Sequence, residues 1–221
     1  TCLRFDIDIT EEWIPVSPSA HYLMGGVATD TAGATSLPGL FAAGEVACSG
    51  VHGANRLAST SLLEGLVFGA RAAQRATAFA SQVSRSVPPL PSARDLDAGP
   101  LGVLEDAEKL RSSLRRVMWG KVGLVRTGDS LASATAQLSR WERAVARAFS
   151  SRRDLEVKNM VQVARCITEA ALWRANSVGA HYRADFPETK RPGWKQHSRL
   201  QREEWLKGSG QASMPRSGFG S

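Results

Sequence analysis

The chain has 221 residues, of which 43% are apolar and 22% are charged. This mixture is typical of a folded globular protein with one medium or two small domains, and it excludes disorder of the whole chain. No apolar run approaches the roughly 18 residues that a membrane span would need. The net charge of +7 is uneven, since residues 1–80 carry 4 basic and 7 acidic side chains and residues 81–221 carry 24 and 14. Basic and acidic residues alternate along the second part, which favours solvated helix faces over a nucleic-acid surface.

The three cysteines, Cys2, Cys48 and Cys166, are far apart and form no CxxC pair. This spacing excludes a disulfide framework, indicates no metal site and makes a reducing compartment the default. The chain begins at Thr1 rather than Met and has no signal-peptide pattern. We therefore expect it to come from partway through a longer protein.

Residues 1–82 predict short strands, a turn and one helix. Strand-like runs occur at residues 7–10 and 39–43, and residues 29–33 have the Asp and Gly of a tight turn. Ser61 and Glu64 stand three residues apart, which predicts a capping box at the start of a helix. Behind it, apolar residues recur at helical spacing. They are Leu62, Leu63, Leu66, Val67, Ala70 and Ala73.

Residues 83–100 contain Pro88, Pro89, Pro91 and Pro100 and are predicted to be a linker, because proline removes backbone donors and restricts its predecessor. Three apolar stripes follow, at about 104–118, 131–148 and 155–172. Their short connections predict a small antiparallel helical bundle. After Pro187 the chain is polar and basic, and its Gly- and Ser-rich end at 209–221 is expected to be disordered.

Three segments in the first part point to chemistry. In SAHYLMGG at 19–26, His21 precedes a glycine pair that lets backbone approach a ligand. In GLFAAGE at 39–45, an apolar run ends in Gly and Glu45, as at the carboxyl end of a strand that meets a nucleotide. In residues 52–64, Arg56 stands in a loop leading into a helix, whose N-terminus favours an anion. Taken singly, each also fits a structural His, a plain turn and a surface Arg.

Together and in this order, the segments resemble the fumarate reductase and succinate dehydrogenase flavoprotein superfamily. The strongest motif is HGANR at 52–56 followed by SLLE at 61–64. The resemblance covers most of residues 5–187 and includes IDIT at 7–10, IPV at 14–16, VGLVR at 122–126 and SVGAHYRADFP at 177–187. Within the superfamily, three features are most similar to the L-aspartate oxidases. They are the ASTS run at 58–61, the short 29–39 connection and the lead-in through residues 7–16.

The resemblance implies an FAD-dependent enzyme that oxidises L-aspartate to iminoaspartate by hydride transfer to FAD. Oxygen, giving peroxide, or fumarate would reoxidise the flavin, and the product would feed quinolinate and pyridine nucleotide synthesis. By position, His21 and Arg56 match the family's contacts to the substrate carboxylates. Glu45, Ser61 and Leu62 match its FAD contacts. The partners implied are a dicarboxylate substrate and a hand-over to quinolinate synthase, with no nucleic acid and no membrane. A bacterial cytoplasm or a plastid stroma fits a soluble enzyme of this kind.

The resemblance also implies the fold class, which is the C-terminal part of an FAD-binding α/β domain followed by a small helical bundle. Residues 1–20 would end a capping domain, 21–82 would belong to the FAD-binding domain, 83–100 would be a linker, 101–187 the helical domain and 188–221 a basic, partly disordered tail. The family's glycine-rich loop and catalytic Arg have no counterpart in this sequence, so we expect both upstream and expect this chain to be incomplete as an enzyme.

Three positions depart from the family's pattern. Thr60 replaces an Asn, and Asn176 and Val178 replace the Glu and Arg of the usual Glu-Ser-Arg-Gly. That Arg normally helps to dock the helical domain. Three alternatives stay open: a succinate dehydrogenase or fumarate reductase flavoprotein, a non-catalytic remnant of the family, and a basic nucleic-acid-binding module built on residues 101–221. The last would show affinity that falls steeply with salt.

Overall fold

The computed structural model of the chain describes residues 1–83, 104–146, 149, 151–188, 193–194 and 196–201. The chain forms two compact units, Thr1–Arg85 and Ser86–Ser221. The expected linker, except for Val83, and the expected disordered end at 209–221 lie outside the described residues.

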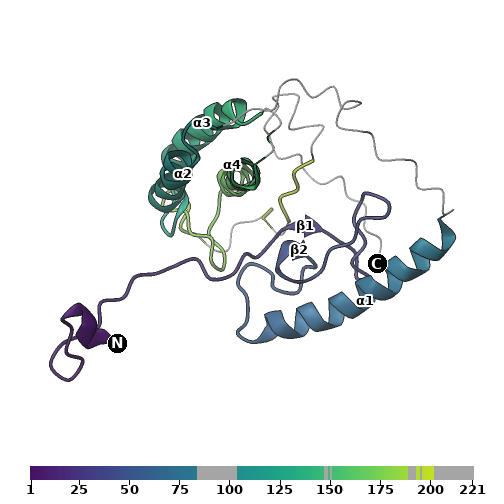
Figure 1. Ribbon diagram of the computed structural model, residues 1–221, viewed down its shortest axis with the longest axis horizontal. Coiled ribbons are helices and arrows are strands. Elements are labelled where there is room, and N and C mark those ends of the chain that lie inside the picture. Colours follow the sequence, from purple (N-terminus) through teal and green to yellow (C-terminus); the bar gives the residue numbers. More distant parts are fainter. Residues whose placement is uncertain (84–103, 147–148, 150, 189–192, 195, 202–221) are drawn as a thin grey trace. The chain divides into compact units, whose positions relative to one another are not determined.

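The first unit combines a small parallel strand pair with one long helix (Figure 1). A short 3-10 helix, η1 (Cys2–Phe5), is followed by strand β1 (Val27–Ala28). A second 3-10 helix, η2 (Gly44–Val46), leads directly into strand β2 (Ala47–Cys48), and helix α1 (Thr60–Gln82) ends the unit. The two strands run parallel, with Val27 opposite Ala47.

A glycine at the start of β1 makes this strand pairing sterically feasible. Gly26 has φ +146°, and a Cβ atom there would lie 2.2 Å from the carbonyl oxygen of Val46. Any side chain at this position would push the two segments apart, so only glycine fits. Gly26, the second glycine of the HYLMGG segment, therefore allows the close approach to Val46.

Both strands expected from the sequence are wrong, whereas the expected turn is confirmed. Residues 7–10 turn back instead of extending, because Asp8 accepts hydrogen bonds from both the backbone and the hydroxyl of Thr10. Residues 39–43 form only an isolated antiparallel bridge, between Ala34 and Phe41. In the predicted turn, the carboxylate of Asp30 accepts from the backbone N–H groups of Ala32 and Ala34. Side-chain hydrogen bonds of this kind compete with strand pairing for the local backbone.

Helix α1 is confirmed, but the predicted capping box is wrong. The helix begins at Thr60, and the N-cap Ser59 has a left-handed backbone and no side-chain cap. Glu64 does not reach back to the cap because its carboxylate is buried and bonded elsewhere. The apolar stripe also does not form a core within this unit, because Leu62 is 76% exposed and Leu63, Leu66 and Val67 are exposed as well.

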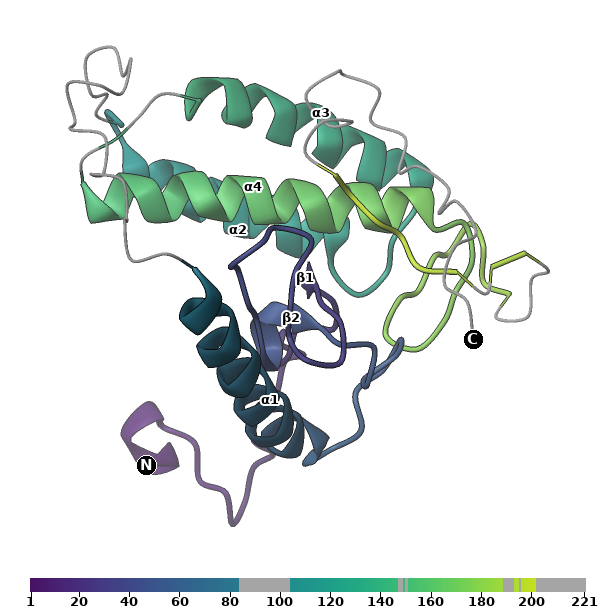
Figure 2. The ribbon, with the colours of Figure 1, turned by 90° about the vertical axis from the view of Figure 1, so that its right-hand side faces the viewer.

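The second unit is a bundle of three helices, as the sequence predicts. Helices α2 (Ala107–Val122), α3 (Gly128–Ala144) and α4 (Arg152–Trp173) lie side by side, and each packs on the other two (Figure 2). Each begins at a side-chain cap, provided by Asp106, Thr127 and Ser151. Such caps satisfy backbone donors that the first helical turn leaves without partners. Among the described helices, none is both long and apolar enough to cross a membrane.

The core of the bundle follows the predicted stripes closely. Leu131, Leu138 and Val161 are fully buried, and Val145 and Phe149 close one end of the bundle. Leu155, expected on the inner face of α4, is instead 40% exposed. Arg165 of α4 forms ion pairs with Glu142 of α3 and with Glu169 of its own helix, so part of the charge on these helices is internal rather than solvated.

The segment after α4 is held by Arg183, whose residue surface is only 2% exposed. Its Nη1 group donates to the carbonyl oxygens of Ala171, Leu172 and Arg174 at 3.1 to 3.3 Å, which covers the negative C-terminal end of α4. Its other nitrogens donate to Asp185 at 2.7 and 2.8 Å. Asp185 also accepts from the backbone N–H of Gly128, so the pair joins the end of α4 to the start of α3.

His181 lies near three arginines, Arg126, Arg174 and Arg183, and is neutral in the fold. Its Nδ1 accepts from Arg126 at 2.7 Å and its Nε2 donates to the carbonyl of Arg174 at 3.2 Å. Burial lowers the pKa of His181 to about 4, although the bond to the Arg174 carbonyl opposes that shift, and the charges of Arg126, Arg174 and Arg183 lower the pKa further. A proton on this ring therefore destabilises the fold.

We predict that acid weakens the bundle through His181. The folded pKa lies below the unfolded value of 6.5, so the unfolded state binds more protons between about pH 6.5 and 4 and stability falls as pH falls through that window. The loss attributable to this residue is about 2 kcal/mol after allowance for solvent screening. Urea unfolding of wild type and His181→Gln at pH 7.5, 5.5 and 4.5 measures it. Equal pH slopes for the two proteins would contradict the prediction.

Candidate functional site

A cluster of four polar side chains forms at the start of α1. Tyr22 comes from the segment before β1, Ser49 and His52 come from the loop after β2, and Glu64 comes from the second turn of α1. Glu64 is 3% exposed, and the side chain of His52 is 8% exposed. We call these four residues the Glu64 cluster.

The carboxylate of Glu64 is the centre of the cluster because all three partners reach it. Ser49 donates to Oε1, while the Tyr22 hydroxyl and His52 Nε2 approach Oε2 at 3.1 and 2.8 Å. Burial alone would raise the pKa of Glu64, but the hydrogen bonds from Ser49, His52 and Tyr22 outweigh it, so this pKa lies below the ordinary value. Burial and the Glu64 carboxylate raise the pKa of Tyr22. At neutral pH the cluster thus holds a carboxylate and a phenol.

Arg56 lies next to the cluster, against the ring of Tyr22. Its guanidinium stacks over the Tyr22 ring, 4.9 Å from the centroid, and its Nη1 donates to the Ser61 hydroxyl at 3.1 Å. Within the described residues no carboxylate pairs with it. A guanidinium fixed by a ring and a hydroxyl keeps planar donors for an incoming carboxylate.

The first turn of α1 offers backbone donors beside Arg56. Within the described residues, the N–H groups of Ser61 and Leu62 have no backbone acceptor before the helix, and the N-cap side chain supplies none. His52 Nδ1 is also buried without a partner in that part of the chain. Unmatched polar groups at a helix N-terminus, where the helix dipole is positive, fit an electron-rich ligand such as the carbonyl edge of a flavin.

Glu45 lies in η2 and supports the segment that carries Tyr22. Its Oε1 accepts from the backbone N–H of Leu23 at 3.0 Å, and η2 packs on α1. Gly44, with φ +74°, lies close to the backbone of Gly65 in α1. A small residue at this point allows the η2 turn to approach the helix.

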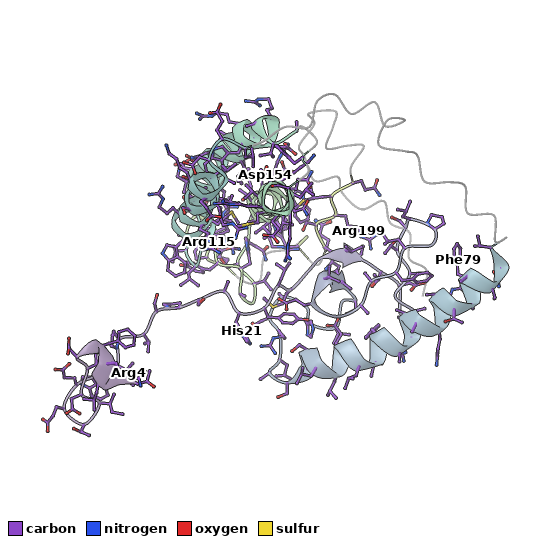
Figure 3. The ribbon with its side chains drawn as sticks, in the orientation of Figure 1. Arg4, His21, Phe79, Arg115, Asp154 and Arg199 are labelled. Atoms are coloured by element: carbon purple, nitrogen blue, oxygen red, sulfur yellow. The ribbon has the colours of Figure 1, made fainter. Side chains whose placement is uncertain are left out.

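The structure brings some of the sequence-predicted site residues together and leaves one apart. The side chains of Arg56 and Ser61 are hydrogen-bonded to each other, and Leu62 follows Ser61 in the first turn of α1. His21, labelled in Figure 3, is exposed, and no hydrogen bond joins its side chain to Arg56 among the described residues. Its place in a substrate site stays a prediction.

Sequence reasoning missed the Glu64 cluster itself. Tyr22 and His52 stood inside the quoted motifs but received no role, and Glu64 was assigned to a capping box. One signal was present: an acid flanked by Leu63 and Gly65 within an apolar helical run has no partner on its own helix. Such an acid is buried only when other segments supply donors.

Two family models match the chain. Residues 1–62 match an FAD binding domain, and residues 111–209 match the C-terminal domain of the fumarate reductase flavoprotein. These matches and the structural neighbours below confirm the expected fold class and resemblance.

Curated relatives include L-aspartate oxidases from bacteria, archaea and plants. The protein from Rhodospirillum rubrum is 47% identical over 188 residues, which cover 85% of this chain and 64% of the relative. That from Halobacterium salinarum is 49% identical over 178 residues, covering 79% and 34%. The chloroplastic protein of Arabidopsis thaliana is 38% identical over 215 residues, covering 86% and 32%. The chain therefore spans between about one third and two thirds of these relatives.

Solved structures give the same fold. The Escherichia coli quinol fumarate reductase flavoprotein matches with a TM-score of 0.73 and 30% identity, covering 88% of this chain and 36% of that one. Succinate dehydrogenase 1 of Mycobacterium smegmatis matches with a TM-score of 0.71 and 34% identity, covering 84% and 34%.

Proposed function

Because the chain belongs to the fumarate reductase and succinate dehydrogenase flavoprotein superfamily, we propose that it is part of an FAD-dependent L-aspartate oxidase. The enzyme oxidises L-aspartate to iminoaspartate, and oxygen or fumarate reoxidises the flavin. The observation that carries this proposal is Arg56, stacked on Tyr22 and hydrogen-bonded to Ser61 at the first turn of α1, with no ion pair to an acid in the described part of the chain. The identity with L-aspartate oxidases over most of the chain supports the choice of substrate.

Two groups of residues have separate tasks. Arg56 binds one carboxylate of the substrate through its planar donors, and His21 contributes a donor to the same dicarboxylate. The N–H groups of Ser61 and Leu62 bind FAD, and Glu45 holds the adjoining segment at its contact with the cofactor. When bound, FAD supplies the acceptor for the two electrons and the hydrogen that leave the substrate.

The chemistry explains why Arg56 is held in place by its neighbours. L-Aspartate is flexible and carries two carboxylates, so cationic and donor groups must hold it before reaction. With FAD bound, the backbone N–H groups of Ser61 and Leu62 would supply fixed donors for the negative charge of the reduced cofactor, which would lower the barrier. The proton-transfer Arg and the glycine-rich loop of the family would come from sequence outside these 221 residues.

The place of the reaction follows from its product. Iminoaspartate hydrolyses in water, so an enzyme that consumes it directly, such as quinolinate synthase, is the natural recipient in pyridine nucleotide synthesis. A bacterial cytoplasm or a plastid stroma would house the enzyme, since its relatives include a bacterial protein and a chloroplastic one.

The experiment is an oxidase assay on the full-length protein purified with FAD. We expect peroxide release on addition of L-aspartate and none on addition of succinate. Succinate-dependent dye reduction without an aspartate signal would instead assign the protein to the dehydrogenases, which the structural matches keep as the second candidate. A flavin-loaded protein inactive with both substrates would be the non-catalytic remnant.

A further inference from the structure

Within the described residues, the Glu64 carboxylate makes no hydrogen bond with Arg56 or with the proposed FAD-binding residues, but one of its partners does contact Arg56. Glu64 is hydrogen-bonded to Ser49, His52 and Tyr22, and of these three Tyr22 stacks against the Arg56 guanidinium. The four residues come from three segments that are far apart in sequence, since Tyr22 and Glu64 are separated by 42 positions. A buried link between such segments fixes their relative placement.

The hydrogen atoms of the cluster have one consistent assignment. An ionised carboxylate only accepts hydrogen bonds, so His52 Nε2 must carry the hydrogen that points to Oε2. The Tyr22 hydroxyl also donates its hydrogen to Oε2 of Glu64, and the Ser49 hydroxyl donates to Oε1. The edge of the Tyr22 ring also meets the His52 ring, with centroids 5.0 Å apart. Both the hydroxyl and the ring plane of Tyr22 are therefore fixed.

A fixed Tyr22 ring in turn fixes Arg56. The guanidinium is held on one side by the ring face at 4.9 Å and at Nη1 by the Ser61 hydroxyl. Stacking on an aromatic face restrains the plane of a guanidinium, and that plane decides which direction its remaining donors face. If the ring could rotate, Arg56 would keep its charge but lose its orientation.

We propose that Glu64 is a positioning residue, which acts through the Tyr22 ring to orient the Arg56 guanidinium toward a dicarboxylate. The inference rests on the proposed function only in taking Arg56 as the carboxylate-binding group. Glu64 itself is no proton-transfer group, since its carboxylate is buried and already accepts three hydrogen bonds.

The test is a double-mutant cycle read by malonate binding to the flavin-loaded full-length protein. Malonate is a dicarboxylate that cannot be oxidised in the same way, and its binding is followed by the change in flavin absorbance. Glu64→Gln keeps the shape but cannot accept all three bonds, and we expect a roughly 10-fold rise in the malonate Kd. Tyr22→Phe keeps the ring and removes only the hydroxyl, and we expect a roughly 3-fold rise. Glu11→Gln, which neutralises an exposed acid, is the matched control and should change nothing.

Arg56→Lys supplies the background that separates positioning from general loosening of the site. A lysine has no plane to orient, so adding Glu64→Gln to Arg56→Lys should weaken malonate binding less than twofold further. The FAD Kd should stay within twofold of wild type in every variant. An equal loss from Glu64→Gln in both backgrounds would overturn the proposal, as would unchanged malonate affinity in a folded Glu64→Gln protein.

Two outcomes keep this inference distinct from the proposed function. If Glu64→Gln does not fold, the same cycle with Tyr22→Phe decides the question. If wild type releases no peroxide with L-aspartate but the cycle shows coupling, the positioning role stands and the assignment as an aspartate oxidase fails. If L-aspartate is oxidised and the cycle shows no coupling, the assignment as an aspartate oxidase stands and the positioning role of Glu64 fails.

Discussion

Arg56→Ala is expected to lower kcat/KM for L-aspartate by about 100-fold or more while FAD stays bound. Removing one partner of a close charge pair in a binding site costs about 3 kcal/mol, which corresponds to that factor. The effect should fall on substrate rather than flavin, because the cofactor contacts proposed for Ser61 and Leu62 use backbone donors that the substitution leaves in place. Steady-state kinetics with L-aspartate, together with the flavin absorbance of the purified protein, measures both quantities.

Arg75→Ala is the matched control for that experiment, because Arg75 is an exposed arginine on α1, the helix that follows Arg56 in sequence. It should leave turnover and flavin content unchanged. If Arg56→Ala retained wild-type kcat/KM, the assignment of the carboxylate-binding group would be wrong. If the variant lost its flavin as well, the division of tasks between the side chain and the helix start would be wrong.

Arg183→Met is expected to lower the free energy of unfolding of the helical unit by about 3–5 kcal/mol. The substitution removes the guanidinium donor from the carbonyl oxygens of Ala171 and Leu172, leaves the Arg174 carbonyl with His181 alone, and separates Asp185 from its arginine partner. Asp185 is partly exposed and can be hydrated, so the main cost comes from the buried end of α4. Methionine fills similar volume, which limits the effect of an empty cavity.

Urea unfolding followed by helical circular dichroism measures this loss, with Arg152→Ala as the control. Arg152, at the start of α4, is likewise an arginine with an acidic partner, Glu156, but its side chain is 93% exposed. Its removal should change stability by less than about 0.5 kcal/mol. A loss below 1 kcal/mol for Arg183→Met would mean that water replaces the guanidinium at the end of α4.

Local pattern predicted the helical unit well because its structure is set by neighbours in sequence. The stripes through Leu114, Leu138 and Val161 recur every three or four residues, and those residues form the core. The caps at Asp106, Thr127 and Ser151 are also local, though the sequence analysis did not single them out. Leu155 is the exception, and its exposure depends on which part of α4 the other two helices cover.

The first unit was harder to predict because few of its residues follow a period. Residues 7–10 have strand-like composition but form a turn, because the carboxylate of Asp8 accepts a hydrogen bond from the backbone N–H of Thr10. Strands β1 and β2 have only two residues each and form by pairing with each other, so neither can be predicted from its own segment alone. Motif order nevertheless identified the family, since HGANR and the helix after it form a specific combination.

The helices, the turn at Asp30 and the family could be predicted from local pattern, because periodicity, turn chemistry and motif order are all properties of adjacent residues. The positions of Glu64 and Arg183 depend on contacts between distant segments. Each is a charged group that can be buried only if distant segments bring enough hydrogen-bonding partners, and the 42 positions between Tyr22 and Glu64 show how distant those partners are. No local pattern carries that information.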